Sequence, residues 1–408
     1  MSAELENAKL LASLMLSAEK PHYTNTSALR SLSPRFLGHV FEDLIKELMP
    51  TVISHKVGEA YEQHKALLEL FLLNLVSVGF SHERLTIPTT PRKGEKIADR
   101  FGLDQRRTKR LVDALVSHGL MVREFTGNRN VRVANNYMPT EKLLIPYAQY
   151  LYLDYSDFDN YEPIRLNGAG HAGDIPWHSN LERDREILVR YNAFMSSHRW
   201  AKKDVTYRSF NDTPFAAGRV HTSYQTIVNR RIPIRRQTLL DGEPIAEPDF
   251  SANHLTLLSM IFDKPLPDSP YDMISDDTGL PKQTIKNVLV RLMGAKNEQG
   301  WSQAKFTLLK SEHQLSNRHS ELIRDSFYKC IPFLKEHNLL ATGWGGKLQF
   351  LEGETAIRMF EWAVDEEIPI INIHDAFACK QQDEQTVYEM MHKKREESLS
   401  IVSNMDIR

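Results

Sequence analysis

Hydrophobic positions recur at helical spacing near the N-terminus, in two stretches on either side of a Ser/Thr-rich break at residues 24–33. A more strongly apolar stretch at residues 60–80 predicts a buried helix. The apolar run at its centre, residues 66–76, is interrupted by Glu69 and Asn74 and is too short to cross a bilayer. These helices predict a hydrophobic core, and we assign no chemistry to them.

The pattern changes at residues 91–134, where shorter elements follow one another closely. Apolar spacing predicts a short helix at residues 94–101 and a second helix at residues 104–118. Two short strands are expected at residues 120–125 and 131–134, on either side of a polar turn. A helix, a tight link, a second helix and a two-stranded wing resemble the winged helix-turn-helix module.

The second helix and the wing of this module are basic. In a helix-turn-helix protein the second helix enters the major groove of DNA, and further side chains contact phosphates. The resemblance therefore predicts DNA binding, and the alternative is a winged helix that contacts only proteins and whose basic residues form a solvated face. We favour DNA binding. The residues assigned to it are Arg106, Arg107, Lys109, Arg110, Arg123, Arg129 and Arg132.

The middle of the chain is less regular. Residues 139–180 are rich in Tyr, Asp and Pro and predict a linker or an irregular subdomain, which a helix at residues 181–198 follows. Residues 196–239 then carry nine Lys or Arg against two Asp, with five aromatic residues interleaved. Such a composition suits the tracking of nucleic acid, because cations contact phosphates and rings stack on bases. A solvated face explains the composition equally well.

Two carboxylates follow short apolar strands in the last half of the chain. Asp249 comes just after the strand predicted at residues 244–246 and just before an amphipathic helix. Asp375 comes after His374, at the end of an apolar strand predicted to begin near Ile370. A carboxylate at a strand end is held rigidly at a rim, where a metal ion could reach it. Further helices are expected at residues 313–338, 355–364 and 383–398, with a turn at residues 343–346.

These carboxylates belong to a series of short motifs in a fixed order. The motifs resemble the palm and fingers of the A-family DNA polymerases, the bacterial DNA polymerase I type, and the resemblance covers about residues 214–383. The motifs are Gly218-Arg-Val220, Ile232-Pro-Ile-Arg-Arg236, Pro248-Asp-Phe-Ser251, Lys282-Gln-Thr-Ile-Lys286 and Ile373-His-Asp375.

The resemblance implies a role for each matched residue. Two metal ions, Mg²⁺ or Mn²⁺, are implied at the carboxylate pair, because nucleotidyl transfer uses two ions roughly 4 Å apart and magnesium prefers carboxylate and phosphate oxygens. The implied metal ligands are Asp249, Asp375 and the carbonyl of Phe250. The implied nucleotide-binding residues are His254, Lys282 and Lys286, and the implied primer or template contacts are Arg219, Arg235, Arg236 and His374.

Each of these residues also has a plain structural explanation when it is taken alone. Asp249 could cap the helix that follows it, the His374-Asp375 pair could belong to a loop, and two lysines four residues apart could form an exposed helix face. The order of all the motifs together favours the polymerase interpretation.

Several motifs depart from the family pattern. His254 stands where the family has the glutamate that excludes the ribose 2′-hydroxyl, which implies relaxed sugar discrimination. Ala376 replaces the acid after Asp375, and Val290 stands near the place of an aromatic stacking residue. The combination resembles the small polymerases of plasmids, phages and mobile elements, some of which act as primases.

The whole chain of 408 residues, with two cysteines and a formal net charge of −2, predicts an α+β protein of a reducing, cytoplasmic compartment without a signal peptide or membrane segment. We expect a helical region with a winged helix at 1–138, a linker or thumb-like helical region at 139–198, and a reduced palm with small helical fingers at 199–408. The expected partners are DNA, nucleoside triphosphates, and a helicase or small accessory protein of the same element.

Two alternatives to a polymerase or primase-polymerase stay open. The first is a non-catalytic DNA-binding replication initiator whose palm is vestigial, which the departures in the fingers motif favour. The second is a regulatory winged-helix protein, which leaves residues 200–380 unexplained.

Overall fold

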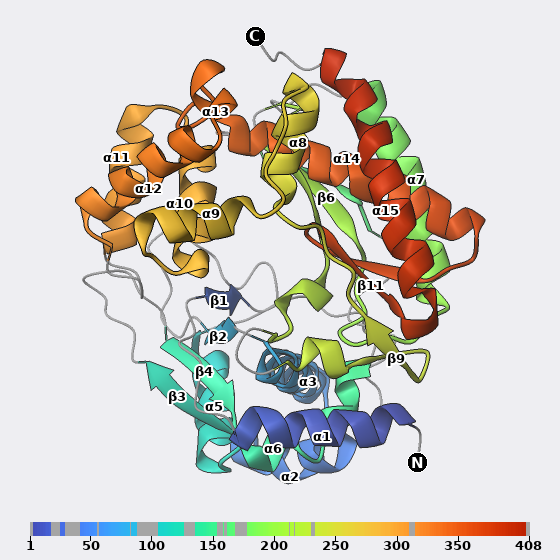
Figure 1. Ribbon diagram of the computed structural model, residues 1–408. Helices are drawn as coiled ribbons and strands as arrows, with labels where there is room; N and C mark the ends of the chain where they lie inside the picture. The colour runs from blue at the N-terminus through green and yellow to red at the C-terminus, as the bar shows by residue number, and fades with distance from the viewer. Residues whose placement is uncertain are drawn as a thin grey trace.

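The computed structural model is a mixed α+β protein of many helices and three small sheets (Figure 1). None of the helices in the part of the chain that it describes is long and apolar enough to cross a membrane. The described residues are 3–17, 25–28, 41–54, 57–81, 83–87, 105–125, 135–152, 158, 161–167, 178–211, 213–215, 217–229, 233–309 and 315–404.

The N-terminal region combines helices with a four-stranded sheet in the order β1-β2-β4-β3, in which β1 is parallel to β2 and the other pairs are antiparallel. The strand β1 lies in the Ser/Thr-rich break, where no strand was expected. The elements are α1 (Ala3–Ser17), β1 (Asn25–Ala28), α2 (Glu42–Val52), α3 (Glu59–Gly79), β2 (Glu83–Ile87), α5 (Gln105–Ser117), β3 (Met121–Phe125) and β4 (Asn135–Pro139).

The predicted buried helix at residues 60–80 is confirmed by α3, and the helix predicted at residues 104–118 is confirmed by α5. The strand β3 also lies where a strand was expected, and it pairs with β4. The short helix at 94–101 and the strand at 131–134 lie outside the described residues.

A three-stranded sheet follows, in which β5 is parallel to β6 and β7 is antiparallel to β6. Its first strand lies in the segment expected to be an irregular linker, and its partner is more than 40 residues away along the chain. The elements are α6 (Glu141–Leu144), η3 (Ala148–Tyr152), β5 (Ile164–Asn167), α7 (Ser179–Ser196), β6 (Tyr207–Asn211), β7 (Ala217–His221), η4 (Ser223–Thr226) and η5 (Arg235–Gln237).

The third sheet is antiparallel, with the order β10-β11-β9-β8. Its strands β8 (Leu239–Leu240) and β9 (Glu243–Ala246) precede Asp249, and β10 (Ile370–Ile373) and β11 (Ala376–Lys380) form a hairpin. The apolar strands predicted before the two carboxylates are therefore confirmed. Asp375 was expected on a strand, but it lies in the two-residue turn of this hairpin, where His374 has a φ of 60°.

Helices surround this sheet, and Figure 1 shows α9 to α13 gathered on one side of the molecule and α7 beside α15 on the other. The single helix predicted at residues 313–338 is wrong, because the chain breaks near Pro332 into two helices. The elements are α8 (Asn253–Phe262), α9 (Pro270–Thr278), α10 (Lys282–Gly294), α11 (Glu298–Leu309), α12 (Asn317–Cys330), α13 (Phe333–Glu336), α14 (Trp344–Asp365), η6 (Gln381–Asp383), α15 (Glu384–Ser398) and η7 (Leu399–Asn404).

The helix α14 is longer than predicted. It begins at Trp344, not at 355, because Gly343 adopts a φ of 85° and turns the chain directly into the helix. The turn expected at residues 343–346 is therefore mostly helical. The added turns carry Glu352, whose charge acts on Asp375.

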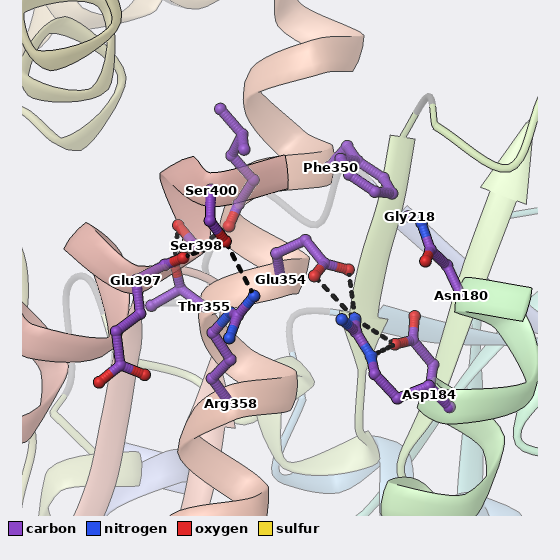
Figure 2. Close-up of polar contacts among 12 residues, drawn as sticks. Asn180, Asp184, Gly218, Phe350, Glu354, Thr355, Arg358, Glu397, Ser398 and Ser400 are labelled. Carbon is purple, nitrogen blue, oxygen red and sulfur yellow. Dashed lines mark hydrogen bonds and ion pairs between the residues drawn. The ribbon is translucent and has the colours of Figure 1, made fainter. Parts of the chain in front are cut away.

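A buried ion cluster fastens α14 to α7 and to the three-stranded sheet. Figure 2 shows Glu354 of α14 and Asp184 of α7 on either side of its ion pairs. The fully buried Arg208 of β6 pairs with both acids and lies 2.7 Å from Glu354, and Arg183 lies 2.7 Å from each acid. Burial acts to raise the pKa of Glu354, but Arg208 and Arg183 outweigh it and hold that pKa below its usual value.

The same cluster fixes the backbone beside it. Arg208 donates through Nε to the carbonyl of Gly218 at 2.6 Å and through Nη2 to the carbonyl of Phe350 at 2.9 Å. A Cβ on Gly353 would collide with the carbonyl oxygen of Gly218, so α14 approaches β7 as closely as only glycine permits. The positions of Arg219 and Glu352, one residue from these glycines, are set by this contact.

The N-terminal region is also tied to the sheets. The buried ammonium of Lys202 donates to the hydroxyls of Ser81 and Thr226, at 2.6 Å in each case. The amide of Val228 donates to the carbonyl of Phe80 at 3.1 Å. The apolar residues of both parts form one continuous core.

Candidate active site

The register of the third sheet brings the two predicted carboxylates together. Asp249 forms an isolated antiparallel bridge with Ala376, and the amide of Phe377 donates to the carbonyl of Pro248 at 3.1 Å. Because Asp375 directly precedes Ala376, Asp249 lies beside the turn that carries Asp375. Two segments that are far apart in the sequence thus meet at one end of the sheet.

The charges of this carboxylate pair are only partly compensated by the protein. Burial and the negative charges of Glu352 and Asp249 raise the pKa of Asp375 to about 7. Asp249 is exposed as a residue, yet loss of water around its carboxyl raises its pKa, and Lys286 and Arg236 act against that rise. Carboxyl groups with a raised pKa in a charged cluster are typical of sites that bind an additional cation or proton.

Glu352 is the third carboxylate of the site and was not predicted from the sequence. Its side chain is only 5% exposed, and its Oε1 lies 2.8 Å from Nε2 of His254, an ion pair that lacks the alignment of a linear hydrogen bond. Arg219 lies 3.4 Å from Oε2, and the amide of Asn253 donates to Oε1 at 3.4 Å. Three elements, β7, α8 and α14, therefore converge on one carboxylate.

The pairing sets the charge of both partners. Burial acts to lower the pKa of His254, but Glu352 outweighs it and raises that pKa above its usual value. In turn, burial acts to raise the pKa of Glu352, and His254 and Arg219 outweigh it and lower that pKa. Next to Asp375, the site thus holds a Glu352–His254 pair in which each partner favours the charged form of the other.

Of the two predicted fingers lysines, Lys286 faces the carboxylate pair. Its ammonium acts on Asp249 and lies 5.2 Å from the ring centroid of Tyr271, a residue of α9 that the sequence analysis also missed. Burial and the charge of Asp375 raise the pKa of Tyr271. Lys282, one turn earlier on α10, instead forms an exposed ion pair with Asp272 at 2.8 Å.

The predicted primer and template residues divide in a similar way. Arg235 is paired with the buried carboxylate of Glu247 at 2.9 Å, whereas the side chain of Arg236 is 65% exposed and lies 3.4 Å from that carboxylate. His374 is exposed as a residue, but the protein around its ring and the charge of Arg219 lower its pKa to about 4. Arg236 therefore acts on Asp249, His374 adjoins Asp375 in the turn, and Arg219 pairs with Glu352, whereas Arg235 supports the fold beside them.

The basic residues predicted to bind DNA in the winged module lie on α5 and β3, apart from two. Arg129 and Arg132 lie outside the described residues. Arg107 donates to Oε1 of Gln63 at 2.6 Å, and the guanidinium of Arg123 lies 5.7 Å from the ring centroid of Tyr137. The remaining three, Arg106, Lys109 and Arg110, are on the exposed face of α5.

The oxygen ligands present fit a divalent cation better than a zinc site. The described residues contain no group of three or more His, Cys, Asp or Glu side chains that could hold a metal ion by themselves. Two neighbouring carboxylates with raised pKa values supply part of an oxygen coordination shell, and magnesium commonly completes its shell with substrate phosphates and water. The ring of Phe250 is buried beneath Arg395, 4.2 Å from its guanidinium, so only its backbone carbonyl could contribute.

Glu352 and Tyr271 left different signals in the sequence. Extending the predicted helix at residues 355–364 toward the N-terminus would have placed Glu352 one turn before Thr355, on a buried face. No periodic signal marks Tyr271, because its place depends on how α9 packs. No protein-family model matches this chain, and no curated protein matches it either.

Proposed function

We propose that this chain is a template-directed nucleotidyltransferase, a DNA polymerase or primase-polymerase that replicates a plasmid, phage or mobile element. One observation carries the proposal. Asp249 and Asp375, 126 residues apart (375 − 249), meet at the end of a sheet, where burial raises both pKa values and the charges of Glu352 and Asp249 raise that of Asp375 further. Two carboxylates on neighbouring strands are what two-metal nucleotidyl transfer requires of a protein.

The residues around the pair have roles that follow from their places. Asp249, Asp375 and the Phe250 carbonyl would hold the metal ions, and Mg²⁺ or Mn²⁺, when bound, activates the attacking hydroxyl and stabilises the leaving pyrophosphate. Lys286 neutralises the triphosphate, as a cation near developing negative charge does. His254 lies beside the sugar of the incoming nucleotide. Arg219, Arg236 and His374 orient the primer and template.

We propose DNA binding for the winged module on separate grounds. Support comes from the exposed basic face of α5 and from the antiparallel pairing of β3 with β4, which follow one another as a recognition helix and wing do. Replacing Arg106 and Arg107 by Ala should reduce duplex affinity and lower the salt dependence, with a slope smaller by roughly 1.8. An unchanged slope would remove this face from the DNA interface. A cytoplasmic location and a helicase or accessory partner of the same element belong to the same proposal.

Two features of α10 favour the alternative of a non-catalytic replication initiator. Lys282 is engaged by Asp272, and Val290 of the same helix is exposed with a side chain too small to stack well on a base. A palm that had lost its chemistry would keep the fold and lose such contacts with nucleotide. The two candidates differ in whether nucleotide is incorporated.

The decisive experiment is an incorporation assay with Mg²⁺ or Mn²⁺ on primed and unprimed templates, using dNTPs and rNTPs. We expect product from the wild-type chain and none above background from Asp249→Asn or Asp375→Asn. The matched control is Asp365→Asn, which removes an exposed carboxylate of α14 that pairs with Arg190 at 2.8 Å. Absence of product under every condition, or product that survives Asp249→Asn, would overturn the enzymatic proposal.

A further inference from the structure

The three-stranded sheet lies edge to edge with the sheet that carries Asp375. The amide of Gln225 donates to the carbonyl of Val220 on β7 at 3.1 Å and to Oδ1 of Asn372 on β10 at 3.2 Å. The charge of Arg219 on β7 also acts on His374 in the hairpin turn. One surface therefore leads from β5 across β7 to the carboxylate pair.

Side chains on this sheet alternate between the two faces. Arg208, Phe210 and Val220 are buried against α14, whereas their neighbours along the strands are accessible to solvent. The register aligns Tyr207 with His221. We call the accessible residues that lead to the turn the outer row: Arg165, Tyr207, His221, Arg219 and His374.

The outer row combines ring faces with positive charge. The guanidinium carbon of Arg165 lies 3.3 Å from the ring centroid of Tyr207, and the rings of Tyr207 and His221 are stacked with centroids 5.2 Å apart and planes 21° apart. Burial, Arg219 and Arg165 lower the pKa of His221 to about 4, so its ring is uncharged at neutral pH. The strands β5, β6 and β7 contain no acidic residue.

We propose that the outer row binds single-stranded nucleic acid and guides its 3′ end to the carboxylate pair. Arg165 and Arg219 attract two phosphates of the strand, and the ring of His221, which is stacked on Tyr207, provides a flat face for a base or sugar. Proteins bind single strands through this combination of cations and aromatic faces, largely without regard to sequence. Only the direction of the strand rests on the proposed function, and binding itself does not.

Arg165→Ala is the test of the phosphate contact, because this side chain is exposed and its removal leaves no cavity in the core. Binding of a fluorescent oligonucleotide of single-stranded DNA, or of RNA with the same sequence, is measured by anisotropy across a salt series. We expect weaker binding of the single strand and a salt slope smaller by about 0.7. The matched control is Arg190→Ala, which removes an exposed arginine of α7 paired with Asp365 and should leave the slope unchanged.

His221→Leu and His221→Asn test the stacked face, and thermal unfolding of each variant identifies any loss of folding. A folded variant should bind the single strand roughly tenfold more weakly. If Arg165→Ala and Arg190→Ala have equal affinities and slopes, the outer row is only a structural contact and the proposal is overturned. Equal affinities for DNA and RNA are expected if the outer row recognises phosphates and bases and does not distinguish the two sugars.

A further variant separates this proposal from the enzymatic one. Asp249→Asn should abolish nucleotide incorporation and still bind the single strand with the wild-type salt slope. If the wild-type chain incorporates no nucleotide but binds the single strand in a way that depends on Arg165, the outer-row proposal is supported and the enzymatic proposal is overturned. If the wild-type chain incorporates nucleotide and its binding of the single strand does not change when Arg165 or His221 is replaced, the enzymatic proposal is supported and the outer-row proposal is overturned.

Discussion

Two groups of acidic side chains, one on each side of α14, differ in how their charge is compensated. Asp184 and Glu354 are each ion-paired with two arginines, which hold the pKa of Glu354 below its usual value, although burial still raises that of Asp184. Asp249 and Asp375 meet at a sheet end, where Lys286 and Arg236 act on Asp249 and His254 acts on Asp375, and the pKa of Asp375 still rises to about 7. Glu352 and Glu354 are two residues apart on the same helix and belong to different groups.

The difference separates a structural cluster from a candidate site. Burying charges is expensive, so a cluster that only holds a fold together is completed by partners of opposite charge. A group that leaves negative charge unbalanced requires either protons or a cation from outside the chain. The second group is therefore where we expect a ligand.

The largest expected effect comes from breaking the compensated cluster. Arg208→Met leaves Asp184 and Glu354 with only Arg183 and removes the donors to two backbone carbonyls. We expect the free energy of unfolding to fall by about 3–5 kcal/mol, as measured by urea denaturation. Arg190→Met, which breaks an exposed pair, should cost under about 1 kcal/mol. Equal losses of unfolding free energy in Arg208→Met and Arg190→Met would show that burial of the cluster does not increase the cost of breaking it.

The opposite effect is expected in the uncompensated group. In the unfolded chain Asp375 has an ordinary pKa near 4, so below pH 4 its carboxyl is protonated in both states and costs nothing. As the pH rises toward 7 and above, the folded state must lose a proton that it binds tightly, and stability falls. Without metal, Asp375→Asn should therefore stabilise the protein at pH 8 by up to about 4 kcal/mol and have no effect near pH 4.

Urea denaturation with a chelator, from pH 4 to pH 8, measures this stabilisation, and Asp365→Asn is the control. Adding Mg²⁺ at pH 8 should stabilise the wild-type chain and leave Asp375→Asn nearly unaffected, because a ligand that binds only the folded state stabilises it. A wild-type stability that does not change between pH 4 and pH 8 relative to the variant would contradict the raised pKa of Asp375.

The smallest effect is expected at Glu352, which lies two residues from Glu354 on α14. Glu352→Gln removes the charge that raises the pKa of His254, so that pKa should fall, as followed by NMR of the ring protons. Loss of a charge-assisted contact should lower the free energy of unfolding by about 1–2 kcal/mol. Glu361→Gln, at an exposed position of the same helix, is the control. An identical pKa of His254 in Glu352→Gln and Glu361→Gln would show that Glu352 does not raise the pKa of His254.

The sequence predicted those elements whose pattern is local. The helices α3, α5 and α8 and the strand β9 have the apolar spacing of their type and lie where they were expected. The strands β1 and β5 were missed, because they have four residues each and are stabilised by partners far along the chain. The start of α14 was missed because Gly343, Gly345 and Gly346 are typical of a turn.

The candidate site was also predicted only in part. The order of motifs brought Asp249 and Asp375 into one hypothesis, and the bridge between β11 and the residues after β9 gives that hypothesis a geometry. The engagement of Lys282 by Asp272 and of Arg235 by Glu247 could not be read from the sequence, because both pairs depend on packing between separate elements.

The contact of Gly353 with the carbonyl of Gly218 has a consequence for how this protein can change over generations. A side chain at position 353 would push α14 from β7 and displace Glu352 and Glu354 together. Substitutions that loosen the scaffold here therefore also disturb the candidate site. A substitution at this contact is therefore expected to change the stability of the fold and the geometry of the candidate site together. Substitutions that change only one of the two must lie elsewhere in the chain.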